Sequence, residues 1–146
     1  MTRKIEIYIA DDDAEDRMFI KQAINKVVPT AKVIEALDGL DLLNKLHHHA
    51  SDSCFTLILI DMNMPELNGF EVISQIKSDP KYQKMFTIVL SASESSALKQ
   101  QAYALDIDSF ITKPFNIDHY EAIANGLKKF FVNQYLRSQK KTLNSN

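Results

Sequence analysis

The sequence contains little of what marks an exported, membrane-spanning or multi-part protein. Cys54 is its only cysteine, so a disulfide framework is excluded and a reducing cytoplasm is the expected location. No stretch approaches the roughly 20 apolar residues needed to cross a membrane. With 3 glycines and 4 prolines, the 146 residues contain no Gly/Ser-rich or Pro-rich linker, and their number suits a single domain.

The sequence also lacks a large excess of positive or negative charge. The formal net charge is −2, which argues against a dedicated nucleic-acid binder. The charge is uneven along the chain, and the end of the chain has no acidic residue after Glu121. Its cations are Lys128, Lys129, Arg137, Lys140 and Lys141. We interpret this segment as a helix whose last turns favour cations, followed by a polar, disordered tail.

Five short apolar runs predict the strands of a parallel sheet. Three of the runs are nearly continuous in Ile, Leu, Val and Tyr, which is typical of strands buried on both faces. The run around Val33-Ile34 is weaker. The expected strands are Ile5–Ala10, Lys32–Ala36, Phe55–Ile60, Phe86–Leu90 and Ser109–Thr112.

Between these runs, apolar residues recur at three- and four-residue steps, the pattern of helices with one buried face. The stripes begin at Met18, Leu40, Phe70, Ala97 and Ile117, and the last one continues to Leu136. Asn116 is the expected N-cap of the last helix. Strand–helix alternation repeated five times predicts a doubly wound α/β domain with right-handed crossovers.

Polar residues follow four of the expected strands. Asp11–Asp13 follow the first, Asp61 the third, Ser91 the fourth and Lys113 the fifth. In open α/β sheets, ligands bind outside the carboxyl ends of the strands. Two carboxylates about 4 Å apart repel by about 4 kcal/mol at an effective dielectric near 20, so this set needs counter-charges. Lys113 and a hard divalent cation would supply them, and a carboxylate is a known covalent acceptor of phosphate.

These residues lie in stretches that resemble the receiver domain of the bacterial response-regulator family. The stretches "IYIADDD", "LILIDMNMPELNGFEVI", "IVLSAS" and "FITKPF" occur in the family's order and spacing, and the resemblance covers residues 4 to about 131. It implies a flavodoxin-like (βα)5 fold, with a five-stranded parallel sheet of order 2-1-3-4-5 and helices on both faces. We therefore expect a stand-alone receiver domain over residues 1–136 and a disordered tail over residues 137–146.

By that resemblance, Asp61 is the phosphoryl acceptor and lies beside a Mg²⁺ site. Asp12 and Asp61 would bind the ion directly, Asp11 through a water molecule, and Asn63 through its backbone carbonyl. Asp13 lies one position past the family's acidic pair. We expect it to cap or precede the helix that follows rather than to bind the metal.

The remaining family residues would surround the phosphoryl group. Ser91 matches the switch hydroxyl, Phe110 the aromatic residue that changes rotamer with it, and Lys113 the cation that pairs with the phosphoryl group. The Lys113–Pro114 bond is expected to be cis, as in the family. The chain departs from the family at Asp106, where many receivers have a glycine suited to a left-handed helix end.

The resemblance implies a signalling protein rather than an enzyme, with slow self-dephosphorylation. A sensor histidine kinase or a histidine phosphotransfer protein would donate the phosphoryl group. The face formed by the fourth helix, the fifth strand and the fifth helix would then bind an unidentified downstream protein. No direct contact with nucleic acid or with a membrane is expected, and a homodimer through the long last helix stays open.

Two other classes of function stay open on the sequence alone. Asp11–Asp13 formally fits the Asp-x-Asp motif of Mg²⁺-dependent phosphohydrolases of the haloacid dehalogenase type, but Glu15 stands where that family has Thr or Val. A pure interaction module would keep the fold without phosphorylation. The run His47–His49 invites a metal interpretation, but successive helix positions point in different directions, so we interpret it as a solvated helix end.

Overall fold

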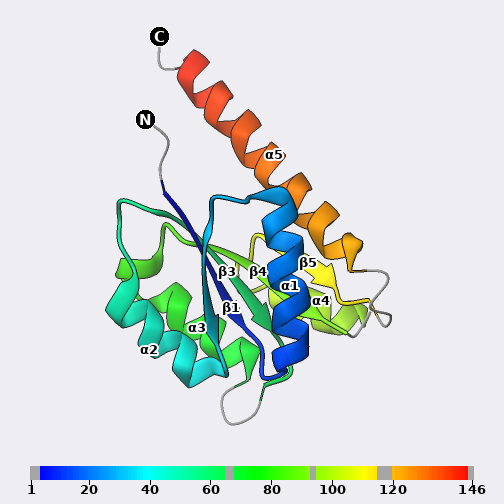
Figure 1. Cartoon of the computed structure of the whole chain (residues 1–146). Helices are drawn as coiled ribbons and strands as arrows, with labels where there is room; N and C mark the ends of the chain where they lie inside the picture. The colour runs from blue at the N-terminus through cyan, green and yellow to red at the C-terminus, as the bar shows by residue number, and fades with distance from the viewer. Residues whose placement is uncertain (1–3, 65–67, 93–94, 115–119, 145–146) are drawn as a thin grey trace.

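The five predicted strands form one parallel sheet. A computed structural model describes residues 4–64, 68–92, 95–114 and 120–144, and the strands lie in the order β2-β1-β3-β4-β5 (Figure 1). They are β1 (Ile5–Ala10), β2 (Lys32–Ala36), β3 (Phe55–Asp61), β4 (Phe86–Ser91) and β5 (Ser109–Thr112). The predicted order is confirmed, and two strands run one residue further than predicted, into Asp61 and Ser91.

Helices cover both faces of the sheet, as Figure 1 shows. One face carries α1 (Ala14–Val27) and α5 (Glu121–Asn144). The other carries α2 (Gly39–His49), α3 (Gly69–Ser78) and α4 (Ser96–Tyr103), with a short 3-10 turn at Pro80–Tyr82 after α3. This arrangement is the doubly wound α/β fold that the sequence predicted.

The central strands are buried on both sides. Along β3, Ile58 and Ile60 face α2 and α3, while Leu57 and Leu59 face α1 and α5, and all four are fully buried. Burying a side chain of this size contributes roughly 1.5–3 kcal/mol, and a slip of one residue would reverse every side chain. The register of β3 in the sheet is therefore well determined, and so is the position of the residues at its carboxyl end.

Short polar side chains begin the first three helices. Asp13 Oδ1 accepts hydrogen bonds from the backbone N–H groups of Glu15 and Asp16, at 2.8 and 3.1 Å. The prediction that Asp13 caps the first helix is confirmed. Asp38 and Asn68 cap α2 and α3 in the same way, and each such cap is worth about 1 kcal/mol.

Helix α5 differs from its prediction at both ends. It begins at Glu121, and the expected cap Asn116 lies outside the described residues. It continues to Asn144, whereas the sequence predicted a helix end near Leu136 and a disordered tail beyond it. Neither proline nor glycine interrupts residues 127–144, so nothing in the local sequence ends the helix earlier. Figure 1 shows the last part of α5 extending past the sheet.

Two backbone predictions concern the ends of α4 and β5. The Lys113–Pro114 peptide bond is trans, since none of the described peptide bonds is cis. The cis bond expected from the family is therefore wrong for this structure, which has the form that X–Pro bonds favour by default. Asp106 has a φ of 61°, so the aspartate adopts the left-handed conformation for which the family uses glycine.

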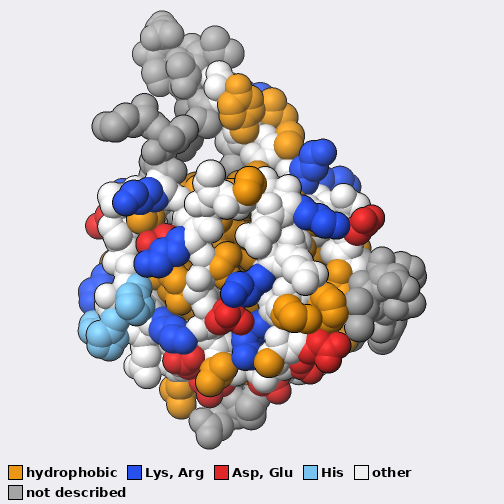
Figure 2. Space-filling model, viewed as in Figure 1, with side chains coloured by type: hydrophobic (Ala, Val, Ile, Leu, Met, Phe, Trp, Pro, Cys, Tyr) orange, Lys and Arg blue, Asp and Glu red, His pale blue; other side chains and the backbone are white. Residues whose placement is uncertain are grey.

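Two further surface features bear on function. Figure 2 shows His47–His49 gathered on the surface at the end of α2, and all three are exposed. Within the described ranges, no helix combines the length and the hydropathy needed to cross a bilayer.

Candidate functional site

The polar residues predicted at the strand ends meet at one edge of the sheet. Asp61 ends β3, Ser91 ends β4, and Asp11 and Lys113 follow β1 and β5. The backbone N–H of Lys113 donates to the carbonyl oxygen of Ser91 at 2.7 Å, which ties the last two strand ends together. All four residues are buried. Because burying an unpaired charge is costly, the charges among them must be paired.

The Lys113 ammonium provides that pairing. Its Nζ lies 2.6 Å from Asp11 Oδ2, 3.2 Å from Asp61 Oδ2 and 3.0 Å from Asp16 Oδ2. An ammonium has three N–H donors, so these three carboxylates use all of them. Two of the three partners, Asp11 and Asp61, were predicted site residues, and the lysine brings them together as expected from their places in the fold.

Negative charge remains in surplus at this edge. Burial raises the pKa of Asp11 to about 6, although the hydrogen bond from Lys113 works in the opposite direction. Burial alone would lower the pKa of Lys113, but the hydrogen bond to Asp11 and the charge of Asp61 outweigh it and raise that pKa. One protonated lysine therefore faces several carboxylates, and the site favours an additional cation.

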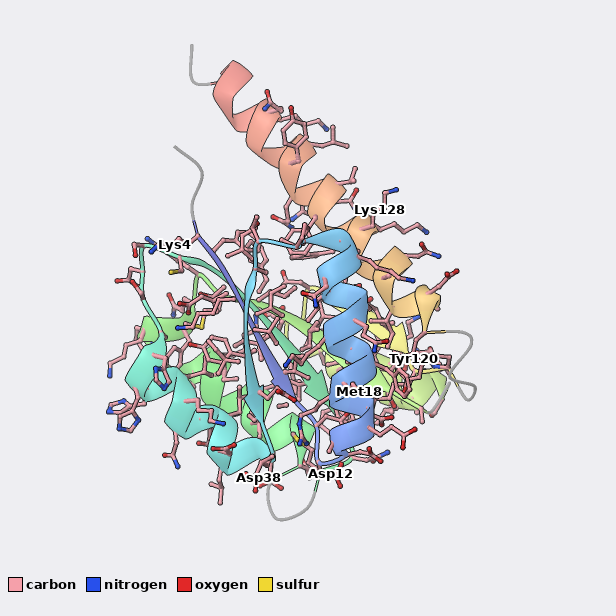
Figure 3. The ribbon with its side chains drawn as sticks, in the orientation of Figure 1. Lys4, Asp12, Met18, Asp38, Tyr120 and Lys128 are labelled. Carbon is pink, nitrogen blue, oxygen red and sulfur yellow. The ribbon has the colours of Figure 1, made fainter. Side chains whose placement is uncertain are left out.

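Asp12 completes an acidic cluster at the mouth of this site. Carboxylate oxygens of Asp11, Asp12 and Asp61 all lie within 4.8 Å of one another, and the Asp12 side chain is exposed. Figure 3 shows Asp12 where β1 gives way to α1. The backbone N–H of Asn63 donates to Asp61 Oδ1 at 3.1 Å, so Asn63 lies beside the same carboxylate. Oxygen donors of this kind suit a hard divalent cation such as Mg²⁺, so the residues present fit a metal site.

Sequence reasoning missed three residues of this edge. Asp16, on the first turn of α1, is the third partner of Lys113. The Tyr120 hydroxyl donates to Asp16 Oδ1 at 2.8 Å, and Figure 3 shows Tyr120 beside α1 at the start of α5. The buried Arg17 donates to the backbone carbonyl of Asp11 at 2.7 Å. The only sequence signal among them was that acidic residues continue past Asp13 to Asp16, and this pattern did not indicate that the Asp16 side chain points toward Lys113.

The two predicted switch residues lie on neighbouring strands. Ser91 is fully buried at the end of β4. Phe110, in β5, is half-buried and packs against the core that lies under α2, α3 and α4. The Lys99 ammonium of α4 lies 5.8 Å from the centre of the Phe110 ring, within the range of a cation–π contact.

A cleft of about 320 Å³ opens directly beside the Asp61 carboxylate. Asp61, Asn63 and Lys113 line it, and its other walls come from the β4–α4 connection, the first turns of α1, and the residues after β5 and before α5. The residues contributed by these walls are Glu15, Asp16, Phe19, Ala92, Pro114 and Tyr120. The acidic edge is thus open to a small ligand and to a partner side chain.

Fold and edge together define a signalling receiver domain of two-component systems rather than a classical enzyme. The chain belongs to the response regulator receiver domain family, whose model matches residues 7–125. This single receiver domain covers most of the chain, and the resemblance drawn from the sequence motifs is confirmed.

Relatives fall in the same family. The probable methanogenesis regulatory protein FilR2 of Methanothrix harundinacea is 26% identical over 129 residues, which cover 86% of this chain and 83% of FilR2. The response regulator GtcR of Aneurinibacillus migulanus is 34% identical over 110 residues, 75% of this chain and 42% of GtcR. The crystal structure of the phosphorylated cyanobacterial phytochrome response regulator RcpA has a TM-score of 0.78 and 29% identity, covering 91% of this chain and 96% of RcpA.

Proposed function

We propose that this chain accepts a phosphoryl group on Asp61 with the help of Mg²⁺ and so acts as a phosphorylation-dependent signalling protein. The observation that carries the proposal is the position of the Lys113 ammonium, 2.6 Å from Asp11 and 3.2 Å from Asp61 in a buried site. A carboxylate acceptor, oxygen donors for a metal and an ammonium for phosphoryl oxygens are the parts that phosphoryl transfer to a carboxylate needs. The similarity to RcpA, which was crystallised in a phosphorylated form, supports the same chemistry.

Four residues would hold the metal. In this proposal Asp12 and Asp61 bind Mg²⁺ directly, Asp11 binds it through water, and Asn63 uses its backbone carbonyl. When bound, Mg²⁺ would offset the surplus carboxylate charge and draw negative charge from the phosphoryl oxygens. The close approach of the three carboxylates supports this assignment.

The phosphoryl donor would be a phosphohistidine of a sensor histidine kinase or of a histidine phosphotransfer protein. An oxygen of Asp61 forms a bond to phosphorus while the N–P bond of the phosphohistidine breaks. The electron pair of the N–P bond stays on the imidazole nitrogen. Lys113 gives up its contact with the Asp61 carboxylate and donates to a phosphoryl oxygen. Slow attack of water on phosphorus would later break the bond between phosphorus and the Asp61 oxygen, release inorganic phosphate and leave Asp61 as a carboxylate again.

The output would be read on the face formed by α4, β5 and α5. The Ser91 hydroxyl binds a phosphoryl oxygen, and Phe110 turns further inward behind it. The half-buried position of Phe110, between the core and Lys99, supports a side chain that changes its depth. An unidentified downstream protein would bind the altered face. A homodimer and a cytoplasmic location stay predictions.

Labelling with acetyl phosphate tests the proposal. We expect intact-protein mass spectrometry to detect one added phosphoryl group in the presence of Mg²⁺, and none in its absence. Asp61→Asn and Asp12→Ala should both abolish the label. Asp13→Asn is the matched control, because it removes a neighbouring charge but keeps the helix cap, and it should label as wild type. Labelling of Asp61→Asn at the wild-type level would exclude Asp61 as the acceptor.

A further inference from the structure

One partner of Lys113 has no part in the phosphoryl chemistry proposed above. Asp16 is neither the acceptor nor one of the proposed metal ligands, yet its Oδ2 lies 3.0 Å from Lys113 Nζ. Its side chain is 29% exposed and that of Lys113 is 8% exposed, so the contact lies at the rim of the buried site. The role of this third carboxylate requires an explanation.

Asp16 is itself held in place by two contacts, one with the cap of α1 and one with the residue that precedes α5. Its backbone N–H donates to the Asp13 cap at 3.1 Å, which fixes it on the first turn of α1. Its Oδ1 accepts from the Tyr120 hydroxyl at 2.8 Å. The Tyr120 ring in turn packs on Phe19 with ring centres 4.9 Å apart. A carboxylate with one oxygen on a packed phenol has little freedom left, so its other oxygen offers Lys113 a fixed acceptor.

The three acceptors of Lys113 behave differently once the site is in use. A metal ion bound to the acidic cluster competes with the lysine for Asp11, and phosphorylation converts the Asp61 carboxylate into an acyl phosphate. Asp16 takes part in neither change, so its hold on the ammonium stays constant. A flexible four-carbon side chain loses one of its resting acceptors during the reaction and needs such an anchor to stay aimed at phosphorus.

We propose that Asp16, held by Tyr120, is a positioning residue that keeps the Lys113 ammonium beside Asp61 during phosphoryl transfer. This inference rests on the proposed function, since it assumes that Asp61 is the acceptor. It assigns a role within the receiver site to α1 and to the start of α5, in addition to the strand ends.

Rates of labelling by acetyl phosphate, measured over a series of Mg²⁺ concentrations, test this role. Asp16→Asn keeps the size of the side chain and removes its charge, and we expect a maximal rate roughly 3- to 10-fold lower. The Mg²⁺ concentration giving half-maximal rate should stay within about 2-fold of wild type, because Asp16 does not bind the ion. A merely structural role would lower stability without this loss in the maximal rate of the folded protein.

Glu15→Gln is the matched control for charge. Glu15 neighbours Asp16 in the chain and lines the same cleft, but among the described residues Lys113 makes its ion pairs with Asp11, Asp16 and Asp61. Its rate should lie clearly closer to that of wild type than the rate of Asp16→Asn does. Equal rates for Asp16→Asn and Glu15→Gln would overturn the inference, and so would a faster Asp16→Asn.

Tyr120→Phe provides a second, milder variant that keeps the ring packing. Losing only the hydroxyl should lower the maximal rate in the same direction by about 2- to 3-fold. The double variant Asp16→Asn/Tyr120→Phe should be no slower than Asp16→Asn, because both changes act through one contact chain. Additive losses would contradict that chain, and Asp16→Glu should recover part of the rate by restoring the charge.

These outcomes separate the inference from the proposed function. If wild type takes no label, or if Asp61→Asn takes the label, the proposed function fails. If wild type labels on Asp61 and Asp16→Asn labels at the same rate, only the positioning role fails.

Discussion

At the scale of single residues, Asp11 is a carboxylate whose burial is unfavourable for its charge. Its side chain is fully buried, and burial raises its pKa to about 6 from an ordinary value of 3.8. The hydrogen bond from Lys113 reduces this cost without removing it. Between about pH 4 and 6 the folded protein therefore binds a proton that the unfolded chain has already released.

This difference predicts how stability depends on pH without metal. Because the folded state binds more protons in this window, the free energy of unfolding should fall as pH rises from 4 to 6. A two-unit difference corresponds to a loss on the order of 2–3 kcal/mol. Urea unfolding in EDTA at several pH values measures it, and Asp11→Asn should remove this part of the slope.

Asp12→Asn is the matched comparison for that experiment. It removes one carboxylate of the same cluster at an exposed position, so the effect of removing the buried Asp11 is measured against it. An unchanged slope in Asp11→Asn would show that the proton is bound elsewhere.

The site contains residues at strand ends, whose positions could be predicted, and residues on other segments, whose positions could not. Asp11, Asp61, Ser91 and Lys113 could be predicted, because parallel strands that end at one edge bring together whatever follows them. Asp16 and Tyr120 could not. Their contact depends on how α1 and α5 pack on each other, and no local pattern encodes that packing. Side-chain contacts between segments distant in the sequence could therefore not be predicted from the sequence.

At the scale of elements, the connection from β3 to α3 depends on one glycine. A Cβ at Gly69 would lie 2.9 Å from Met62 Cα and 3.1 Å from the carbonyl oxygen of Asp61. These are backbone atoms of Asp61 and of the residue after it, so they have little freedom to move away. A Cβ at Gly126, in α5, would instead meet the end of the Ile111 side chain at 2.7 Å, and that side chain can rotate.

The contrast predicts different effects of two glycine-to-alanine changes. Gly69→Ala should lower the free energy of unfolding by about 1–3 kcal/mol, the range for overpacked interiors. Gly126→Ala should cost less, because alanine gains roughly 1 kcal/mol over glycine within a helix. Urea unfolding measures both, and a Gly69→Ala protein as stable as wild type would contradict the close approach.

Strands were predicted more accurately than helix faces. A near-continuous apolar run predicts a strand that is buried on both faces, so no buried face has to be chosen. The predicted strand bounds agree with the structure within one residue. The stripes of α1 and α2 were each assigned an apolar residue that is exposed, Met18 at 47% and Leu40 at 50%. In α2 the buried residues are Gly39, Leu42 and Leu46, so the predicted stripe is right at Leu46 and wrong at Leu40. When a helix offers two apolar stripes, its rotation is set by packing against the sheet, which periodicity alone does not determine.

At the scale of the whole molecule, the fold concentrates its electrostatic cost at one edge. Two apolar cores, one on each face of the sheet, stabilise the domain away from the site. The carboxylates at the strand ends work against that stability, since one lysine does not neutralise them. A ligand that adds positive charge there should therefore stabilise the entire domain, because folding alone brings Asp11, Asp12 and Asp61 together.

Mg²⁺ should accordingly raise the free energy of unfolding of the whole chain. At a Mg²⁺ concentration 100 times its dissociation constant, linkage predicts a gain of about 2.7 kcal/mol. Thermal unfolding with EDTA and with increasing Mg²⁺ measures this as a rising midpoint. Asp12→Ala removes a proposed ligand on the exposed side of the cluster and should abolish the rise, whereas Glu15→Gln removes a nearby charge and should retain it. A midpoint in wild type that does not respond to Mg²⁺ would contradict a metal site at these carboxylates and leave Lys113 as their observed counter-charge.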